Sequence, residues 1–396
     1  MILLYFLKRE NASVRPRSIV LIILAGDFWQ KNPPGGVSLA EQLVMADVPT
    51  DNTEKSEDPH SARAKGLNHF RQASRTILTE QMRAAEDPEL QQHLEALRDT
   101  ASQEPITASL LKRLQVISQE DIATNPKLRF APIGVLSNFE RHRFNHSQLL
   151  AWASYYDVPA FRWKLPIQGR WPEFHEERVL DQMYEDELGL WGYFARGAPV
   201  MLLDNVQPSK LLANGASGFL HSLSFLDDGE NCAKVTAAQG FEGFITLDAP
   251  PHSINFQLHV AAHESTEGIE SLMNDGTIVV PITFSDHKVP YTTTSLHSVL
   301  HNIPKKVFVT THMVTLAFAL TDFKVQGKTL DYFVVNLRPH AWFPHMDLRG
   351  FYVFLSRVRS FESLRLLSCG SKPQGLEVPL QIAAHSSTCN LDCWIQ

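Results

Sequence analysis

Short apolar runs separated by polar turns recur along this chain and predict the strands of an α/β fold. Four such runs are residues 18–25 (SIVLIILA), 316–320 (LAFAL), 333–337 (FVVNL) and 352–355 (YVFL). They are short, and most of their residues are aliphatic or aromatic, without strict polar alternation. This pattern is typical of strands that are buried on both faces of a largely parallel sheet.

Other stretches follow different patterns. Apolar residues recur at helical spacing within residues 66–98, where Asp87, Pro88 and Glu89 form a typical helix start. Residues 218–307 alternate short apolar runs with turns rich in Gly, Asp and Pro. This alternation predicts a mostly β insertion between the helical and strand-forming parts of the chain.

Length and composition place the chain among ordinary globular proteins of two or three domains. It has 396 residues, of which 44% are apolar and 20% are charged. The formal net charge of −7 argues against a surface that binds nucleic acid everywhere, but not against a local basic groove. Four scattered cysteines make no disulfide framework, and the seven apolar residues at the start are too few to span a membrane. We therefore expect an intracellular protein.

Two basic clusters follow apolar runs that we predict to be strands. Residues 324–329 (KVQGKT) follow the run at 316–320, and residues 356–359 (SRVR) follow the run at 352–355. Ligands of open α/β sheets bind at the carboxyl ends of strands, so two basic clusters at one edge favour a phosphate ligand. The alternative is that these are ordinary solvated loop residues. The Gly-Lys-Thr at 327–329 is not a phosphate-binding P-loop, because the motif requires a glycine where Asp322 stands.

The exact strings around these clusters resemble a known family. TDFKVQGKTL at 321–330 and FYVFLSRVRSFESLRLL at 351–367 closely resemble the last two signature motifs of the petite-integration-frequency (PIF) family of superfamily-one DNA helicases. The family includes the helicases carried by Helitron transposons. GDFWQ at 26–30 resembles the family's third motif, and the segment after that motif is matched around Arg83. SNFERHRFN at 137–145 resembles the start of the second lobe.

The resemblance implies an α/β fold with two RecA-like lobes, ATP in the cleft between them and single-stranded DNA across their top. A further string, GAPVMLLDN at 197–205 followed by Asn214 and Gly215, resembles the strand that leads into a small inserted β-barrel. The expected organisation is a partial first lobe (1–124), a second lobe (125–214 and 308–370), a β-rich insertion (215–307) and a tail (371–396).

The resemblance also implies roles for particular residues. Gln30 would touch the terminal phosphate of ATP, and Arg357 would be the arginine finger, which makes these two the expected catalytic residues. The expected contacts to ATP are Asp27, Gln30, Arg141 and Arg357. The expected DNA contacts are Lys324, Gln326, Gly327 and Thr329. ATP and Mg²⁺ are the implied cofactors, and no residue of this chain is predicted as a metal ligand.

Several departures from the family pattern reduce the expected activity. Members carry a Walker A loop and a Walker B Asp-Glu before the third motif, but residues 1–25 contain no glycine and no Asp-Glu pair. Asp322 and Phe323 replace the family's usual Ile-His, and Asp204 stands where a basic residue is frequent. We therefore expect an N-terminally truncated DNA helicase, of a family that unwinds DNA 5′ to 3′, that does not hydrolyse ATP by itself.

Two other interpretations remain open. The chain could be a non-enzymatic single-stranded DNA-binding remnant of a transposon helicase, or a structural α/β protein in which these strings persist without activity. The expected partners are single-stranded or forked DNA, with no membrane and no stable protein partner. The family's habit implies a nuclear location.

Overall fold

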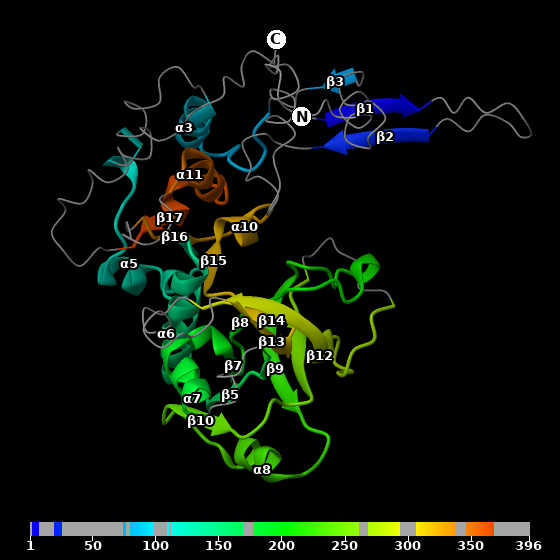
Figure 1. Cartoon of the computed structure of the whole chain (residues 1–396). Helices are drawn as coiled ribbons and strands as arrows, with labels where there is room; N and C mark the ends of the chain where they lie inside the picture. Colours follow the sequence, from blue (N-terminus) through cyan, green and yellow to red (C-terminus); the bar gives the residue numbers. More distant parts are fainter. Residues whose placement is uncertain are drawn as a thin grey trace, which may run out of the picture.

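A four-stranded parallel sheet forms the centre of one body of the molecule. The computed structural model describes residues 2–7, 20–25, 74–76, 80–98, 109–110, 112–168, 177–260, 268–293, 306–337 and 346–367. The strand order is β15-β4-β16-β17, with β15 at Ala319–Thr321, β4 at Ile133–Val135, β16 at Phe333–Val335 and β17 at Leu364–Leu366 (Figure 1). All four pair in parallel, and every residue of β4, β15 and β16 is buried. The parallel sheet confirms the predicted α/β class.

Helices cover this sheet and connect its strands. They are α3 (Pro88–Arg98), α5 (Gln119–Thr124), α6 (Asn138–Tyr156), α10 (Asp322–Val325) and α11 (Leu348–Leu355), with short 3₁₀ turns at η1 (Pro126–Leu128) and η5 (Phe361–Ser363). The first turn of α6 is closed by a capping box, in which Ser137 and Glu140 satisfy each other's backbone amides. The helix ends where Asp157 adopts a left-handed conformation.

One predicted strand of the sheet is wrong. Residues 352–355, which we expected to be a buried strand, are the last turn of α11. The helix starts at Asp347, whose side chain accepts a hydrogen bond from the Gly350 amide at 2.6 Å. Residues 352–355 are all buried, and a short apolar run of this kind does not distinguish helix from strand.

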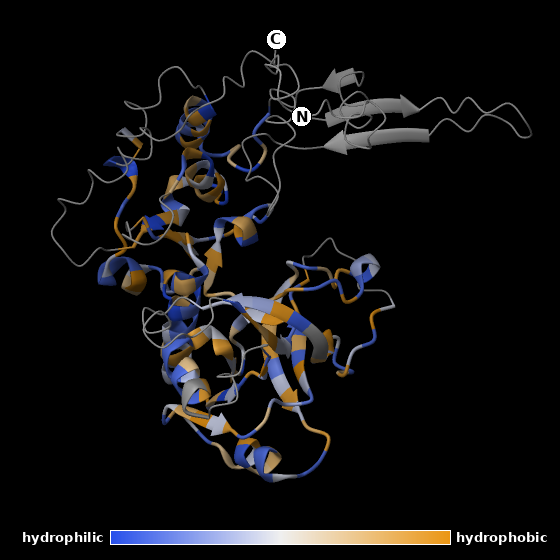
Figure 2. Ribbon diagram, viewed as in Figure 1, coloured by the Kyte–Doolittle hydropathy of each residue, from blue (hydrophilic) through white to orange (hydrophobic). Residues whose placement is uncertain are grey.

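A second body is built mainly of antiparallel strands. Its seven-stranded sheet has the order β14-β8-β9-β11-β12-β13-β6, and a smaller sheet has the order β10-β5-β7. The larger sheet contains β6 (Ile167–Gln168), β8 (Pro199–Leu202), β9 (Ser217–Ser224), β11 (Ser253–Leu258), β12 (Val279–Thr292), β13 (Lys306–His312) and β14 (Val314–Leu316). Figure 2 shows both apolar and polar residues along these strands.

The remaining elements of the second body surround its smaller sheet. They are β5 (Ala160–Lys164), β7 (Trp191–Ala195), β10 (Phe244–Leu247), α7 (Glu177–Asp186), α8 (Glu230–Ala237), η3 (Leu188–Leu190) and η4 (Pro208–Lys210). The predicted insertion at 215–307 supplies β9 to β12, whereas the flanking chain supplies the other strands of this body. The β-rich part is therefore assembled from residues on both sides of the predicted boundaries.

A small sheet near the N-terminus has the order β2-β1-β3, formed by β1 (Ile2–Leu7), β2 (Val20–Ala25) and β3 (Ser74–Thr76). The strand predicted at 18–25 is confirmed, but its pairing is antiparallel. Only twelve residues separate β1 from β2, a connection that suits antiparallel neighbours better than a parallel crossover. β3 lies within the stretch that we predicted to be helical, so that part of the helix prediction is wrong. No described helix is long and apolar enough to cross a membrane.

Asn145 joins the two bodies. It lies in the middle of α6, which contacts β4 and β15 of the parallel sheet and also β5 and β7 of the second body (Figure 1). Its buried amide donates to the Leu316 carbonyl at 3.1 Å and accepts from the Ala319 amide at 2.8 Å. These two bonds satisfy the backbone where the chain passes from β14 to β15, at the boundary between the sheets.

Replacing Asn145 with alanine should therefore destabilise the fold. Two buried backbone groups lose their partners, which typically costs about 2–4 kcal/mol in total. Urea unfolding followed by tryptophan fluorescence measures the loss. The matched control is Asn138→Ala, because Asn138 is exposed on the first turn of the same helix. Equal unfolding free energies for the two variants would contradict the bridging role.

Candidate nucleic-acid interface

The four residues that we expected to contact DNA lie together in one short helix and the turn that ends it. α10 begins directly after β15, at the carboxyl edge of the parallel sheet, and contains Lys324. Gln326 follows the helix, and Gly327 has a φ of 82°, a left-handed conformation that favours glycine. Thr329 is exposed just beyond this turn. The backbone thus presents a compact, polar turn at the edge where α/β sheets bind their ligands.

Two lysines of this turn bind the loop between β8 and β9. The Lys324 ammonium donates to the Asn214 side-chain oxygen at 3.2 Å. The Lys328 ammonium donates to the Gly215 carbonyl at 2.7 Å and to the Ser217 hydroxyl at 2.8 Å. Two of the strings that carried the family resemblance, more than 100 residues apart in sequence, therefore meet in space.

Arg83 connects two more of these family-like strings, its own and the one at 351–367, to the turn after α10. Its Nε donates to the Thr329 hydroxyl at 2.9 Å, and its Nη1 donates to the Ser356 carbonyl at 2.6 Å. The Leu330 amide also donates to the Arg357 carbonyl at 2.8 Å, which ties the turn after α10 to the end of α11. The segments around residues 83, 214–217, 322–330 and 356–359 form one contact network.

This network gathers positive charge, and we call the four residues Arg83, Lys324, Lys328 and Arg359 the basic junction. None of the four forms an ion pair with a described carboxylate. Burial lowers the pKa of Lys328, and the charge of Lys324 lowers it further. Burial also lowers the pKa of Arg83, and Arg359 contributes in the same direction. The cations repel one another, so a bound polyanion would relieve the repulsion.

The residues expected to contact ATP lie in different surroundings. Asp27 and Gln30 are outside the described residues. Arg357 is only 4% exposed, and its guanidinium donates to the Val353 carbonyl at 2.7 Å and to the Ser356 hydroxyl at 2.6 Å. Arg141 projects from α6 into a pocket of the second body, where it donates to the Thr315 hydroxyl at 3.2 Å. The arginine-finger role of Arg357 stays a prediction.

Lys328 and Arg359 were missed as candidate site residues. Lys328 belongs to the Gly-Lys-Thr at 327–329, which is not a P-loop. Its position four residues after Lys324, on the turn where the backbone reverses, was the available signal. Arg83 was matched by the resemblance, but its contact with Thr329, 246 residues away, follows only from the fold. Within the described residues no group of three or more His, Cys, Asp or Glu could hold a metal ion.

Comparison with known proteins gives similarity only to solved structures, since no family model and no curated protein matches. The chain is similar to a Pif1 helicase from Candida albicans, with 19% identity over 78% of this chain and 59% of that chain, at a TM-score of 0.42. It is also similar to unliganded Pif1 from Bacteroides sp (18% identity, 78% and 53%, TM-score 0.36) and to Bacteroides Pif1 bound to single-stranded DNA (17%, 71% and 49%, TM-score 0.38). The chain spans about half to three-fifths of the length of these structures.

Proposed function

We propose that this chain is a DNA-helicase-like protein that binds single-stranded DNA across the basic junction. The observation that carries the proposal is the cluster of four cations without a described carboxylate partner, in a chain whose formal net charge is −7. Phosphate contacts supply most of the affinity of proteins that bind nucleic acid without sequence preference. The motif-like strings around residues 83, 322–330 and 356–359 support the same function, because they converge on this cluster.

The residues of the junction suit a single strand better than a duplex. Lys324, Lys328 and Arg359 supply charge along the turn, and the exposed Thr329 hydroxyl and the Gly327 backbone can bind phosphate oxygens. Phe323, beside Lys324, is 48% exposed and offers a ring on which an unpaired base can stack. Duplex bases are already stacked on one another, so this ring favours single-stranded or forked DNA.

We also propose the domain organisation and the ATP contacts that the family resemblance implies. A partial first lobe, a second RecA-like lobe, a β-rich insertion and a tail remain the proposed units. Asp27, Gln30 and Arg357 are the proposed contacts to ATP, with Mg²⁺. Arg141, which the resemblance also assigns to ATP, lines the pocket of the second body instead. The sequence contains no Walker A motif, so we propose that this polypeptide does not turn over ATP by itself. Movement 5′ to 3′ along DNA and a nuclear location are further expectations of the same resemblance.

Binding and hydrolysis measured on one preparation test this function. We expect a fluorescent oligothymidylate to bind at low salt, and a duplex of the same length to bind more weakly. We expect no ATP hydrolysis above background, with or without the oligonucleotide. Failure to bind the single strand would reject the function, whereas DNA-stimulated hydrolysis would reject only the proposed inactivity.

A structural role for the junction is the second candidate. Lys328 and Arg83 each donate to acceptors of the chain itself, at Gly215, Ser217, Thr329 and Ser356, so they also cross-link distant segments. Under this alternative, removing the charges would lower the thermal midpoint and leave DNA affinity unchanged.

A further inference from the structure

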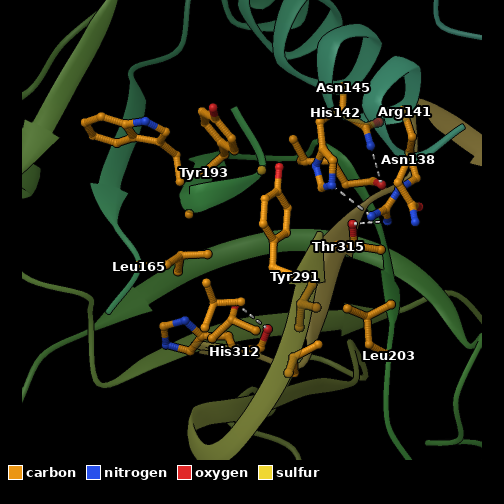
Figure 3. Close-up of a pocket in the computed structure, with 18 of the residues that line it drawn as sticks. Asn138, Arg141, His142, Asn145, Leu165, Tyr193, Leu203, Tyr291, His312 and Thr315 are labelled. Atoms are coloured by element: carbon orange, nitrogen blue, oxygen red, sulfur yellow. Dashed lines mark hydrogen bonds between the residues drawn. The ribbon is translucent and has the colours of Figure 1, made fainter. Parts of the chain in front are cut away.

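A pocket of about 680 Å³ lies in the second body, next to the parallel sheet. Its walls come from α6, β5, β7 and the strands β12 to β14. Figure 3 shows Arg141 and His142 projecting from α6 toward Tyr291 and Thr315 on the opposite strands. The volume lies within the range of about 300–1,000 Å³ that is typical of small-ligand pockets.

The pocket opens beside the basic junction. Four of its lining residues are exposed: Asn138, Pro290, Thr292 and Phe323. Asn138 begins α6, which follows β4, and Phe323 lies in α10, which follows β15; these two strands pair in parallel. The first turns of α6 and α10 are therefore neighbours at the carboxyl edge of the sheet. Lys324 belongs to both features, because it lines the pocket and binds Asn214 of the junction.

The charge of the pocket favours an anion. It is lined by Arg141 and Lys324, and none of the described residues that line it is acidic. Arg141 is held by neutral partners, since it donates to Thr315 at 3.2 Å and to the His142 ring nitrogen Nε2 at 3.2 Å. Burial lowers the pKa of Lys324, and the charge of Arg141 lowers it further. A partly buried guanidinium without a counter-ion is unfavourable, and a bound phosphate would stabilise it.

The rings of the pocket favour a planar ligand. Tyr193 and Tyr291 line it, and both hydroxyls are fixed at the wall: Tyr193 donates to the Leu188 carbonyl at 3.0 Å, and Tyr291 donates to a Glu187 carboxylate oxygen at 2.9 Å. Rings that are fixed before binding lose little conformational entropy when a ligand stacks on them. An aromatic base therefore suits this space better than a flexible aliphatic anion.

Three lining residues also carry a buried nitrogen that has no described partner: Nε of Arg141, Nε1 of Trp163 and Nδ1 of His312. Trp163 is 0% exposed and His312 is 1% exposed. His312 donates from Nε2 to the Pro251 carbonyl at 3.0 Å, so in its neutral form Nδ1 is a hydrogen-bond acceptor. The buried wall of the pocket thus holds two donors and one acceptor without a described partner.

We propose that this pocket takes one nucleotide of a single DNA strand, with its base turned out of the strand. The phosphate binds Arg141 and Lys324, and the base lies between the tyrosine rings. The proposal rests on the proposed function, because the strand reaches the opening from the basic junction. A free nucleotide carries the same phosphate and base, so the experiment must separate the two sources.

Affinity for two oligomers, measured by fluorescence anisotropy, tests the pocket. One oligomer is oligothymidylate and the other has the same backbone without bases. We expect Asn138→Trp, which places a large ring at the exposed opening, to weaken binding of oligothymidylate about tenfold, the value of one stacked base, and to leave binding of the abasic oligomer unchanged. We expect Arg141→Gln to weaken oligothymidylate binding by at least the same factor.

The matched control is Arg143→Gln, since Arg143 is exposed on α6 two residues away and does not line this pocket. If both pocket variants bound oligothymidylate as tightly as Arg143→Gln does, the proposal of a nucleotide pocket would be rejected. The proposed function would still stand. If the natural sequence bound neither oligomer, the proposed function would fall, and thymidine monophosphate would then test the pocket alone. Quenching of tryptophan fluorescence by this nucleotide, lost in Arg141→Gln, would assign the pocket to a free nucleotide. If thymidine monophosphate did not quench the fluorescence, the proposal of a nucleotide pocket would be rejected.

Discussion

Acidification from neutral pH is expected to destabilise this protein well before its carboxylates become protonated. Burial, assisted by the charge of Arg141, lowers the pKa of His142 to about 3, and burial lowers the pKa of His312 to about 4. In the unfolded chain both titrate near the ordinary value of 6.5. Between 6.5 and these lowered values the unfolded state binds more protons, so the free energy of unfolding falls as the pH falls.

The expected loss is large. Each pKa unit corresponds to about 1.4 kcal/mol, so the two histidines together account for a loss on the order of several kcal/mol by the time the pH has fallen about two units below neutral. The loss begins as the pH drops below 6.5 and continues toward the folded-state values. Urea unfolding of the natural sequence at both pH values measures it.

A double variant, His142→Gln with His312→Gln, should make the unfolding free energy much less dependent on pH in this range. His221→Gln, on β9, is the matched histidine control. An unfolding free energy that stayed constant from neutral pH to about two units lower would contradict the neutral state of these rings.

The second large effect is expected at Arg357. Its guanidinium donates to the Val353 carbonyl and the Ser356 hydroxyl at the end of α11, and it is buried in the body of the parallel sheet. Alanine would leave these acceptors without this donor, at a cost of about 2–4 kcal/mol. Arg359→Ala, two residues later and exposed, should change the unfolding free energy by no more than about 0.5 kcal/mol.

This comparison also limits how Arg357 can be tested as an arginine finger. If Arg357→Ala is much less stable than Arg359→Ala, a loss of nucleotide chemistry in that variant reports stability as well as catalysis. Equal stability of the two variants, measured by urea unfolding, would show that the guanidinium bonds at the end of α11 contribute little.

The parallel sheet was predictable because burial on both faces leaves an apolar run with no polar alternation. β15 and β16 arise from such runs, at residues 316–320 and 333–337. The same property led to the wrong prediction of a strand at residues 352–355, since a buried helix such as α11 also gives an apolar run. The helix start at Asp347 lies outside that run and was the missing signal.

The site was predictable only in part. The turn after α10 was found because its residues are adjacent in sequence. The contacts of Arg83 with Thr329 and of Lys328 with Gly215 join residues more than 100 positions apart, and spacing along one chain does not predict them. The pocket around Arg141 was not predicted, because its walls come from several separate strands and carry no motif.

The salt dependence of single-stranded DNA binding tests the basic junction most directly. The logarithm of the affinity should fall linearly with the logarithm of the salt concentration, with a slope of about 0.7 for each phosphate neutralised. We expect the double variant Lys324→Gln with Lys328→Gln to bind oligothymidylate more weakly and to have a slope smaller by about 1.4 than the natural sequence. An unchanged slope and affinity in this variant, with the fold intact, would contradict DNA binding at the junction.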